Sequence, residues 1–298
     1  MVRICTLPAR LLALQYGADL VYSEEIIDHR FIQCTRHINE RYGTIDFIQD
    51  EDSRPMFRTC AAEKGKVVFQ IGTADPERAL QAAKIVEHDV AAIDVNMGCP
   101  QPYSTKGGMG ASLLSKPELI KAILLKLVGN LSIPVTCKIR VLPNLHDTLE
   151  LVKIIEATGV AAIAVHGRLK EERSRHRVRD DVIRAVAECL TIPVIANGGS
   201  REVINSYGDI VKFREMTGSS SVMVARAAQD NCSVFRAAGN LPQFDVVKEY
   251  LRIAISINNH YINCKYCVLQ IMKGLQESPD GRKVRYQKDE KGCSCRQP

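Results

Sequence analysis

Residues 135–167 read VTCKIRVLPNLHDTLELVKIIEATGVAAIAVHG, with two apolar runs on either side of a longer segment that has a helical pattern. The apolar residues of the two runs are largely continuous, which is typical of parallel strands buried on both faces. Gly159 marks the end of the helical segment. The stretch therefore predicts a strand, a helix and a second strand of one parallel sheet.

The same unit recurs over roughly 230 residues of the chain. Asp75 before Pro76 predicts one helix start, and the box SKPE at 115–118 predicts another. With the two runs above, the strand-like runs number seven, and the other five lie at 19–23, 67–72, 91–96, 193–199 and 220–226.

Strands alternating with helices leave two architectures, an open doubly wound sheet or an eight-stranded barrel. Polar residues stand at the end of nearly every run, which favours the barrel, because there such ends converge on one mouth. An open sheet would gather them at a single switch point. We predict an α/β fold, a (β/α)8 TIM barrel, whose mouth carries Gln70, Asn96, Lys138 with Arg140, His166 with Arg168, Asn197 and Arg226.

The predicted barrel is one strand short, and its first visible run already follows a helical stretch, LPARLLALQYG. We therefore expect the first strand to precede Met1 and assign residues 1–239 to the barrel. From about residue 240 the pattern is helical without strands, so we predict a small, shortened helical domain at 240–298. Its last 22 residues, 277–298, have almost no apolar content and predict a loose tail.

Composition narrows the class of protein. The 298 residues are 46% hydrophobic, with a net charge of +6 that permits an anionic partner. No apolar run reaches the ~18 residues of a membrane span, and the first ten residues lack a secretory pattern. Eleven cysteines, an odd number, favour reduced thiols. We expect a cytoplasmic monomer that does not bind membranes.

A zinc site is a further possibility, because the chain has cysteine pairs near its end. We expect no metal, since the first pair falls in a helical run. The four cysteines concerned are Cys264, Cys267, Cys293 and Cys295.

Two segments near the end of the predicted barrel suit a phosphate group. NGGS at 197–200 offers backbone N–H groups before a helical stretch, and VAR at 224–226 adds a guanidinium after the next strand. Loops after the last two barrel strands form the usual phosphate site of this fold. The pair predicts a cofactor that carries phosphate.

Two further residues have a structural and a functional interpretation. The ammonium of Lys138 needs an anion, either a barrel carboxylate such as Asp94 or the anionic N1–O2 edge of a reduced flavin. His166, before a glycine, is either a satisfied barrel histidine or a site residue.

The segment DVNMGCPQPYSTKGGMGASLL at 94–114 places Cys99 in a loop at the mouth. A thiol with an unperturbed pKa near ~8.5 keeps its proton at neutral pH and can protonate a carbanion. Lys106 could orient this thiol or bind a substrate phosphate. The alternative is that Cys99 only packs.

The segment RLKEERSRHRVR at 168–179 holds six basic and two acidic residues, a net of +4. It is either a solvated loop or a contact surface for an RNA backbone.

Together, NMGCPQPYSTKGGMGASLL, CKIR, AVHGR, IPVIANGG and VMVARAA resemble the tRNA-dihydrouridine synthases. The likeness covers nearly all of residues 1–275 and is strongest to the eukaryotic class that acts on uridine 20 of the D-loop. That class has a first barrel strand, a longer helical domain and a C-terminal double-stranded-RNA-binding domain, and we expect none of these to be complete in this sequence.

The resemblance implies an FMN-binding barrel that uses NADPH to reduce a uridine C5–C6 bond in tRNA. Hydride would pass from flavin N5 to C6, and Cys99 would protonate C5. It implies flavin contacts at Met1, Gln70, Lys138, His166, Asn197, Gly198, Gly199, Ala225 and Arg226, and substrate contacts at Asn96, Lys106 and Arg168.

Two other functions stay open. A flavin barrel acting on a small molecule, of the dihydroorotate dehydrogenase type, would share the phosphate site but would not need the basic segment. A truncated paralogue could bind RNA without turnover.

Overall fold

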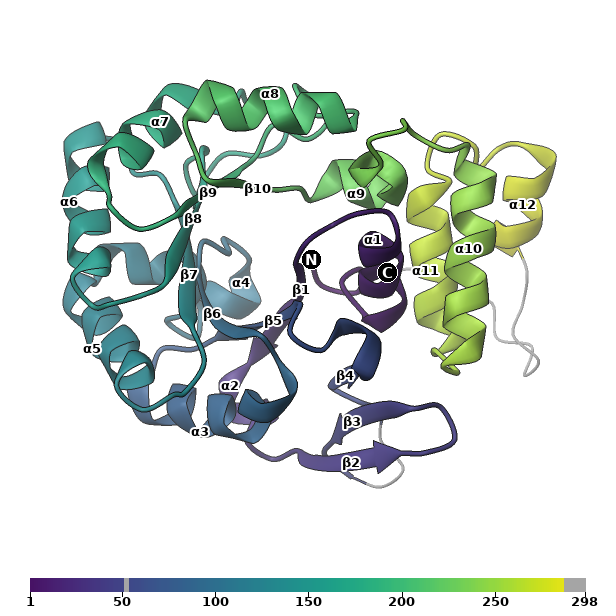
Figure 1. Cartoon of the computed structure of the whole chain (residues 1–298), viewed down its shortest axis with the longest axis horizontal. Helices are drawn as coiled ribbons and strands as arrows, with labels where there is room; N and C mark the ends of the chain where they lie inside the picture. Colours follow the sequence, from purple (N-terminus) through teal and green to yellow (C-terminus); the bar gives the residue numbers. More distant parts are fainter. Residues whose placement is uncertain (51–53, 287–298) are drawn as a thin grey trace.

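The computed structural model describes residues 1–50 and 54–286, and a curved parallel sheet organises it (Figure 1). All seven predicted runs are strands of this sheet, which confirms the strand prediction. In spatial order they are β1 (Val21–Ile27), β5 (Val67–Gly72), β6 (Ala92–Met97), β7 (Val135–Arg140), β8 (Ala162–His166), β9 (Val194–Asn197) and β10 (Ser221–Met223).

An arc of helices covers the outer face of the sheet in Figure 1. Its members are α3 (Pro76–Val86), α5 (Pro117–Val128), α6 (Leu145–Glu156), α7 (Asp180–Cys189) and α8 (Tyr207–Thr217). The Asp75 carboxylate caps α3 by accepting from the N–H groups of Glu77 and Arg78 at 2.9 Å, as predicted. The helix start predicted at 115–118 is also confirmed, since α5 begins at Pro117, but its N-cap is Lys116 and no side-chain cap forms.

The sheet is open in the described part of the chain, with β1 and β10 as its two edges. In Figure 1 the N-terminus and α1 (Leu7–Gln15) lie at the opening between these edges. The described residues therefore form seven parallel strands of a TIM-like sheet, and the closed eight-stranded barrel stays a prediction.

A second sheet of three antiparallel strands, which the sequence analysis missed, lies between β1 and β5 in the chain. Its strands are short and contain no long apolar run, and four of the five β2 residues are exposed. Phe47 and Phe57 anchor it on Phe31 and Phe69, with ring centroids 4.7 to 5.6 Å apart. The strands are β2 (Thr35–Asn39), β3 (Thr44–Ile48) and β4 (Phe57–Cys60).

Short helices connect these elements. They are α2 (Asp28–Phe31), α4 (Pro102–Thr105), α9 (Arg226–Asp230) and the 3-10 turns η1 (Ala61–Glu63), η2 (Glu87–Asp89), η3 (Gly110–Ser115) and η4 (Cys232–Phe235).

Helices without strands follow residue 240, as predicted. They are α10 (Gln243–Ser256), α11 (Tyr261–Ile271) and α12 (Pro279–Tyr286), and α10 packs on α1 and α11. Helix α12 falls in the segment predicted to be loose, whereas 287–298 lie outside the described residues. Whether this region is a separate domain stays a prediction.

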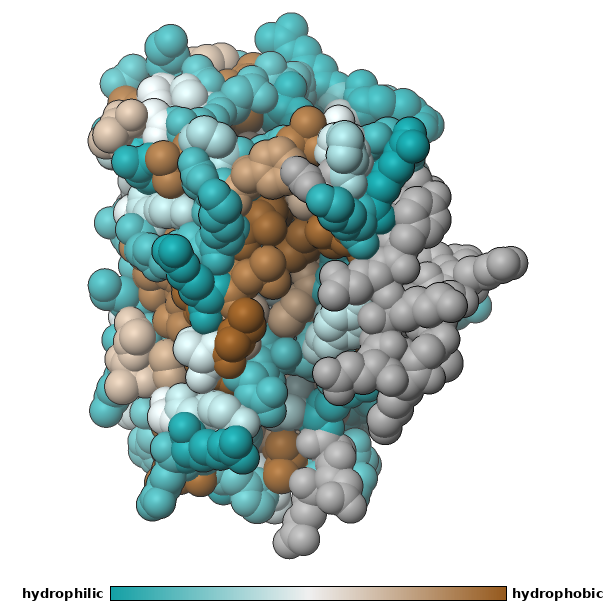
Figure 2. Space-filling model, turned by 90° about the vertical axis from the view of Figure 1, so that its right-hand side faces the viewer, coloured by the Kyte–Doolittle hydropathy of each residue, from teal (hydrophilic) through white to brown (hydrophobic). Residues whose placement is uncertain are grey.

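Apolar residues gather on the face formed by these last helices (Figure 2). Exposed apolar side chains of α10 and α11 are Phe244, Ile262 and Ile255, the last of which is 76% exposed. Among the described helices, none is both long and apolar enough to cross a membrane.

A buried ion pair ties α1 to the antiparallel sheet. The Arg10 guanidinium donates to both carboxylate oxygens of Glu63, at 2.7 and 2.8 Å. It also donates to the carbonyls of Cys5 and Arg58, at 2.7 and 2.6 Å. Both charged side chains are almost completely buried. Removing one partner would leave the other charge buried and unpaired.

We predict that Arg10→Ala lowers the free energy of unfolding by roughly 3 to 5 kcal/mol, because the Glu63 carboxylate would lose its counter-ion. Guanidinium unfolding measures this loss. Lys248→Ala, at an exposed ion pair on α10, is the control and should change stability by about 0.5 kcal/mol or less. A loss no larger than that of the control would show that Arg10 does not hold the two parts together.

Candidate active site

The strand register brings the predicted polar residues to one end of the sheet. Neighbouring strands pair Asn96 with Lys138, Arg140 with His166, and His166 with Asn197. Because parallel strands end on the same edge, these side chains from β6 to β9 converge there.

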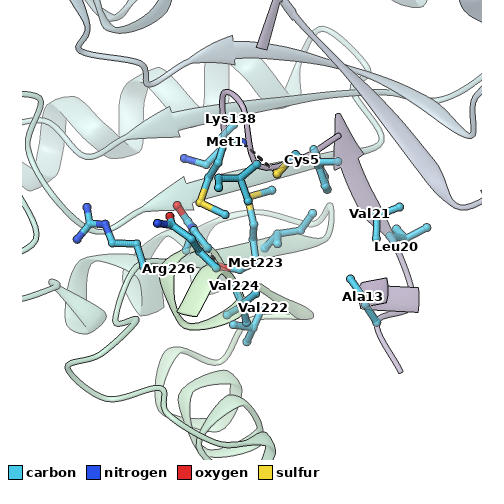
Figure 3. A pocket seen from close by; sticks show the side chains of 18 of the residues that line it. Met1, Cys5, Ala13, Leu20, Val21, Lys138, Val222, Met223, Val224 and Arg226 are labelled. Carbon is cyan, nitrogen blue, oxygen red and sulfur yellow. Dashed lines mark hydrogen bonds between the residues drawn. The ribbon is translucent and has the colours of Figure 1, made fainter. Parts of the chain in front are cut away.

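A cavity of about 670 Å³ opens at this edge. It extends to the opening between the sheet edges, where Val21 of β1 and Val222 of β10 both line it (Figure 3). Its volume is in the range of small-molecule and cofactor sites. Nine of the predicted site residues line it, namely Met1, Gln70, Asn96, Cys99, Lys138, His166, Asn197, Ala225 and Arg226.

Lys138 reaches into this cavity beside Met1 (Figure 3). Its ammonium has no hydrogen bond or ion pair to any described residue. Loss of hydration and, to a smaller extent, the nearby Arg140 lower the pKa of Lys138 to about 8, and Asp94 opposes the shift. A cation held in this way favours an anionic ligand.

The Lys138–Asp94 salt bridge considered above is absent from the described structure, because amide and hydroxyl groups satisfy Asp94. Gln70 Nε2 and Thr136 Oγ1 donate to the Asp94 carboxylate at 2.8 and 2.7 Å. Burial nevertheless raises the pKa of Asp94 to about 6.

Gln70 also connects Asp94 to the loop that carries the Cys99 thiol. Its Oε1 accepts from Asn96 Nδ2 at 3.2 Å. The Asn96 Oδ1 accepts from the N–H groups of Gly98 and Cys99, at 3.0 and 3.1 Å. A hydrogen-bonded series thus runs from the sheet interior to the backbone of Cys99.

The glycine cluster after Cys99 has a packing reason. Gly110 has φ +57°, and a Cβ there would lie 2.5 Å from the Cys99 carbonyl oxygen and 2.4 Å from Ser104 Oγ. Any side chain at this position would displace the loop. The Cys99 thiol lies 3.5 Å from the Tyr103 hydroxyl, which donates to Glu25 at 3.1 Å.

His166 and Arg226 line the end of the cavity away from Val21, and the pKa values of both side chains are lowered. Burial, together with Lys138 and three arginines, lowers the pKa of His166 well below its ordinary value, so this imidazole is neutral at pH 7. Burial also lowers the pKa of Arg226, whose guanidinium has no hydrogen-bond partner among the described residues. Figure 3 shows Arg226 on the far side of the cavity from Val21.

Gly198 and Gly199 lie behind this end of the cavity and do not line it. Both have positive φ, +125° and +68°, and a Cβ would lie 2.6 Å from Val178 or 2.5 Å from Val203. Asn197 donates to the Met223 carbonyl at 2.7 Å, which fixes it against β10. The turn therefore requires glycine at both positions.

Two of the predicted substrate residues lie outside the cavity lining. Lys106 is exposed at the end of α4. Arg168 is buried and donates to Glu202 at 2.7 Å and to the His176 carbonyl at 2.6 Å. Arg168 thus holds later residues of the basic segment 168–179 in place instead of facing the cavity.

The predictions missed two residues that contact the thiol loop, Glu25 and Tyr103. Tyr103 stands only four residues after Cys99, and this closeness in sequence could have identified it. No local signal points from Glu25 to Cys99, since 74 residues separate them.

No group of three or more His, Cys, Asp or Glu side chains within residues 1–50 and 54–286 could hold a metal ion. Cys293 and Cys295 lie outside the described residues. The zinc alternative is therefore untested for the complete set of four cysteines.

Sequence comparison identifies the family. The model of the family described as dihydrouridine synthase (Dus) matches residues 1–276. The chain belongs to the Dus family.

Two fungal relatives of this Dus chain are similar over 92% of its length. It is 41% identical to the tRNA-dihydrouridine(20) synthase of Schizosaccharomyces pombe and 37% identical to that of Saccharomyces cerevisiae. The names of both relatives specify NAD(P)+. The Dus chain spans 58% of the length of the first and 76% of the second.

Among solved structures, DHODH of Eimeria tenella in complex with ferulenol is similar to the Dus chain with a TM-score of 0.51. The two are 12% identical, and the match covers 87% of this chain and 83% of that one. This likeness supports the TIM-like α/β fold alone.

Proposed function

We propose that this chain reduces the C5–C6 bond of uridine 20 in the D-loop of tRNA, with FMN as cofactor and NADPH as reductant. One observation carries the proposal: the unpartnered Lys138 ammonium and the Cys99 thiol face the same cavity of a Dus-family chain. The names of the fungal relatives support the substrate and the nicotinamide reductant.

The residues present fit FMN. Lys138 and Gln70 would hold the polar edge of the flavin ring, because a cation there stabilises negative charge. Arg226, with the backbone of Asn197 and Ala225 that line the cavity, would hold the phosphate, since a guanidinium binds phosphate through charge-assisted hydrogen bonds. Gly198 and Gly199 would shape the turn that follows Asn197. When bound, FMN would supply the hydride for C6 of the uracil ring.

Cys99 is suited to supply the proton for C5. Burial and the Glu25 carboxylate raise the pKa of its thiol above the ordinary value, so the proton is retained at neutral pH. The loop places this thiol at the cavity, and Asn96 holds its backbone. A proton donor must be protonated and within reach of the reacting carbon, and Cys99 meets the first condition here.

The basic segment 168–179 is the candidate tRNA contact. Arg173, Arg175 and Arg177 are exposed, whereas Arg179 pairs with Glu172 at 2.6 Å. Exposed guanidinium groups near the mouth suit phosphates of an RNA backbone. A small-molecule dehydrogenase of this fold would not need them.

We also propose a monomer in the cytoplasm. All nine described cysteines are free thiols, which suits a reducing compartment.

The cofactor assignment predicts that the purified protein binds FMN and that Arg226→Ala weakens binding about 10- to 100-fold, the effect of losing a hydrogen bond to a charged group. Quenching of flavin fluorescence on titration measures Kd. Arg252→Ala, exposed on α10, is the control and should bind like the wild type. A folded protein that FMN cannot reconstitute would favour the non-catalytic RNA-binding alternative.

The proton-donor role predicts that Cys99→Ala still binds FMN and is reduced by NADPH, since that step needs no acid from Cys99. Reoxidation of the reduced flavin by unmodified tRNA should slow by about 10²- to 10⁴-fold. Anaerobic stopped flow with mapping of dihydrouridine measures both steps. Cys99→Ser should also be slow, because a hydroxyl is a far weaker acid. Wild-type rates in both variants would assign Cys99 to packing.

The RNA contact predicts that replacing Arg173, Arg175 and Arg177 together with Ala weakens tRNA binding and flattens its salt dependence, because fewer counter-ions are released. NADPH oxidation should stay unchanged. Binding isotherms at several salt concentrations provide the test. A parallel loss of both activities would instead mean that the segment supports the fold.

A further inference from the structure

Strand β1 contains an irregularity that aims Glu25 at the active site. Its register against β5 advances from Tyr22 opposite Val68 to Glu25 opposite Gln70, three residues on β1 against two on β5. Such a bulge re-aims a side chain and is common beside active sites. Glu25 consequently lines the cavity that holds Cys99.

The neighbouring backbone leaves room for this carboxylate. A Cβ on Gly72, at the end of β5, would lie 2.9 Å from Glu25 Oε1. Two hydroxyls of α4 then fix the carboxylate, Ser104 donating to Oε1 at 2.9 Å and Tyr103 to Oε2 at 3.1 Å. Glu25 thus joins β1 to the loop after β6.

The hydrogen bonds of this cluster have a defined direction. An ionised carboxylate only accepts, so the single proton of the Tyr103 hydroxyl is directed to Glu25. The phenol oxygen is then an acceptor for the thiol, and Cys99 Sγ donates to it at 3.5 Å. This direction requires a protonated thiol.

The charges around Cys99 explain why its thiol needs Glu25 in order to stay protonated. The charged or titratable groups that face it are Lys138 and Arg140 from β7, Tyr103 from α4 and Glu25 from β1. Two nearby cations favour a thiolate, which has no proton to give. Glu25 opposes them and supports the raised pKa of Cys99, of which burial is the larger cause.

We propose that Glu25 and Tyr103 are positioning residues: Glu25 keeps the Cys99 thiol protonated, and Tyr103, whose hydroxyl Glu25 holds, directs the hydrogen-bonding geometry of that thiol. The proposal rests on the proposed function, in which Cys99 is the proton donor. The proposal gives neither Glu25 nor Tyr103 a direct part in binding FMN or tRNA.

The first test is alkylation of Cys99 by iodoacetamide across a pH series, followed by mass spectrometry of the Cys99 peptide. Glu25→Gln should move the midpoint about one pH unit lower, because removing the negative charge makes the thiolate easier to form. Glu24→Gln removes the same charge from the same strand and is the matched control, with an unchanged midpoint. A Glu25→Gln midpoint equal to that of the control would overturn the proposal.

A second comparison tests the part played by Tyr103. In a Tyr103→Phe background, Glu25→Gln should shift the midpoint less than half as far as in the wild-type background, because the hydroxyl that links the two groups is gone. Equal shifts would overturn the role of Tyr103 and reduce Glu25 to a general charge effect. Tyr103 is 51% exposed and Glu25 is partly exposed, so both variants should keep the wild-type Tm.

A third measurement separates this proposal from the proposed function. In Glu25→Gln the alkaline limb of the rate of flavin reoxidation by tRNA should move lower by the same pH interval as the alkylation midpoint, since a general acid fails above its pKa. If the wild type does not react with tRNA but the alkylation midpoint still shifts in Glu25→Gln, the proposed enzyme function is refuted. The effect of Glu25 on the Cys99 thiol would still hold in that case. An unmoved limb in an active enzyme would overturn the positioning role.

Discussion

The parallel register of strands β5 to β9 is the constraint on which the site depends. Because the strands run in one direction, each contributes the side chains near its end to the same rim, and the pairing of Asn96 with Lys138 and of His166 with Asn197 sets their order around it. A slip of one residue in any pair would turn the polar side chains to the opposite face. The apolar residues between them, such as Ile139 and Val165, are fully buried and resist such a slip.

Within this frame, electrostatics divides the cavity into two regions. Lys138 and Arg226 have no described partner, so their charges remain available to an anion. The two carboxylates nearby are engaged differently: Asp94 by an amide and a hydroxyl, and Glu25 by two hydroxyls. The cavity is therefore cationic around Lys138 and Arg226 and has one anionic corner beside Cys99.

Much of the fold could be predicted from local pattern, because a buried parallel strand and its helix are defined by contiguous residues. The seven strands and the cap at Asp75 were of this kind. The antiparallel sheet was missed because its strands are short and largely polar, and its stability comes from Phe47 and Phe57 packing on aromatic rings distant in the chain. The helix start at 115–118 was predicted correctly, but its side-chain cap was not, because Pro117 begins the helix one position later than a capping Ser115 would require.

The sequence by itself determined the strand and helix order, the rim residues and the glycine turn at 198–199, since each depends on residue type and local spacing. Only the tertiary structure decided which groups bind the two carboxylates of the site, Asp94 and Glu25. It separated Asp94 from Lys138 and brought Glu25 to Tyr103 and Cys99 through a bulge in β1. A bulge depends on how two strands pair, and a contact across 74 residues depends on how the sheet curves, so neither is encoded in any short stretch of the chain.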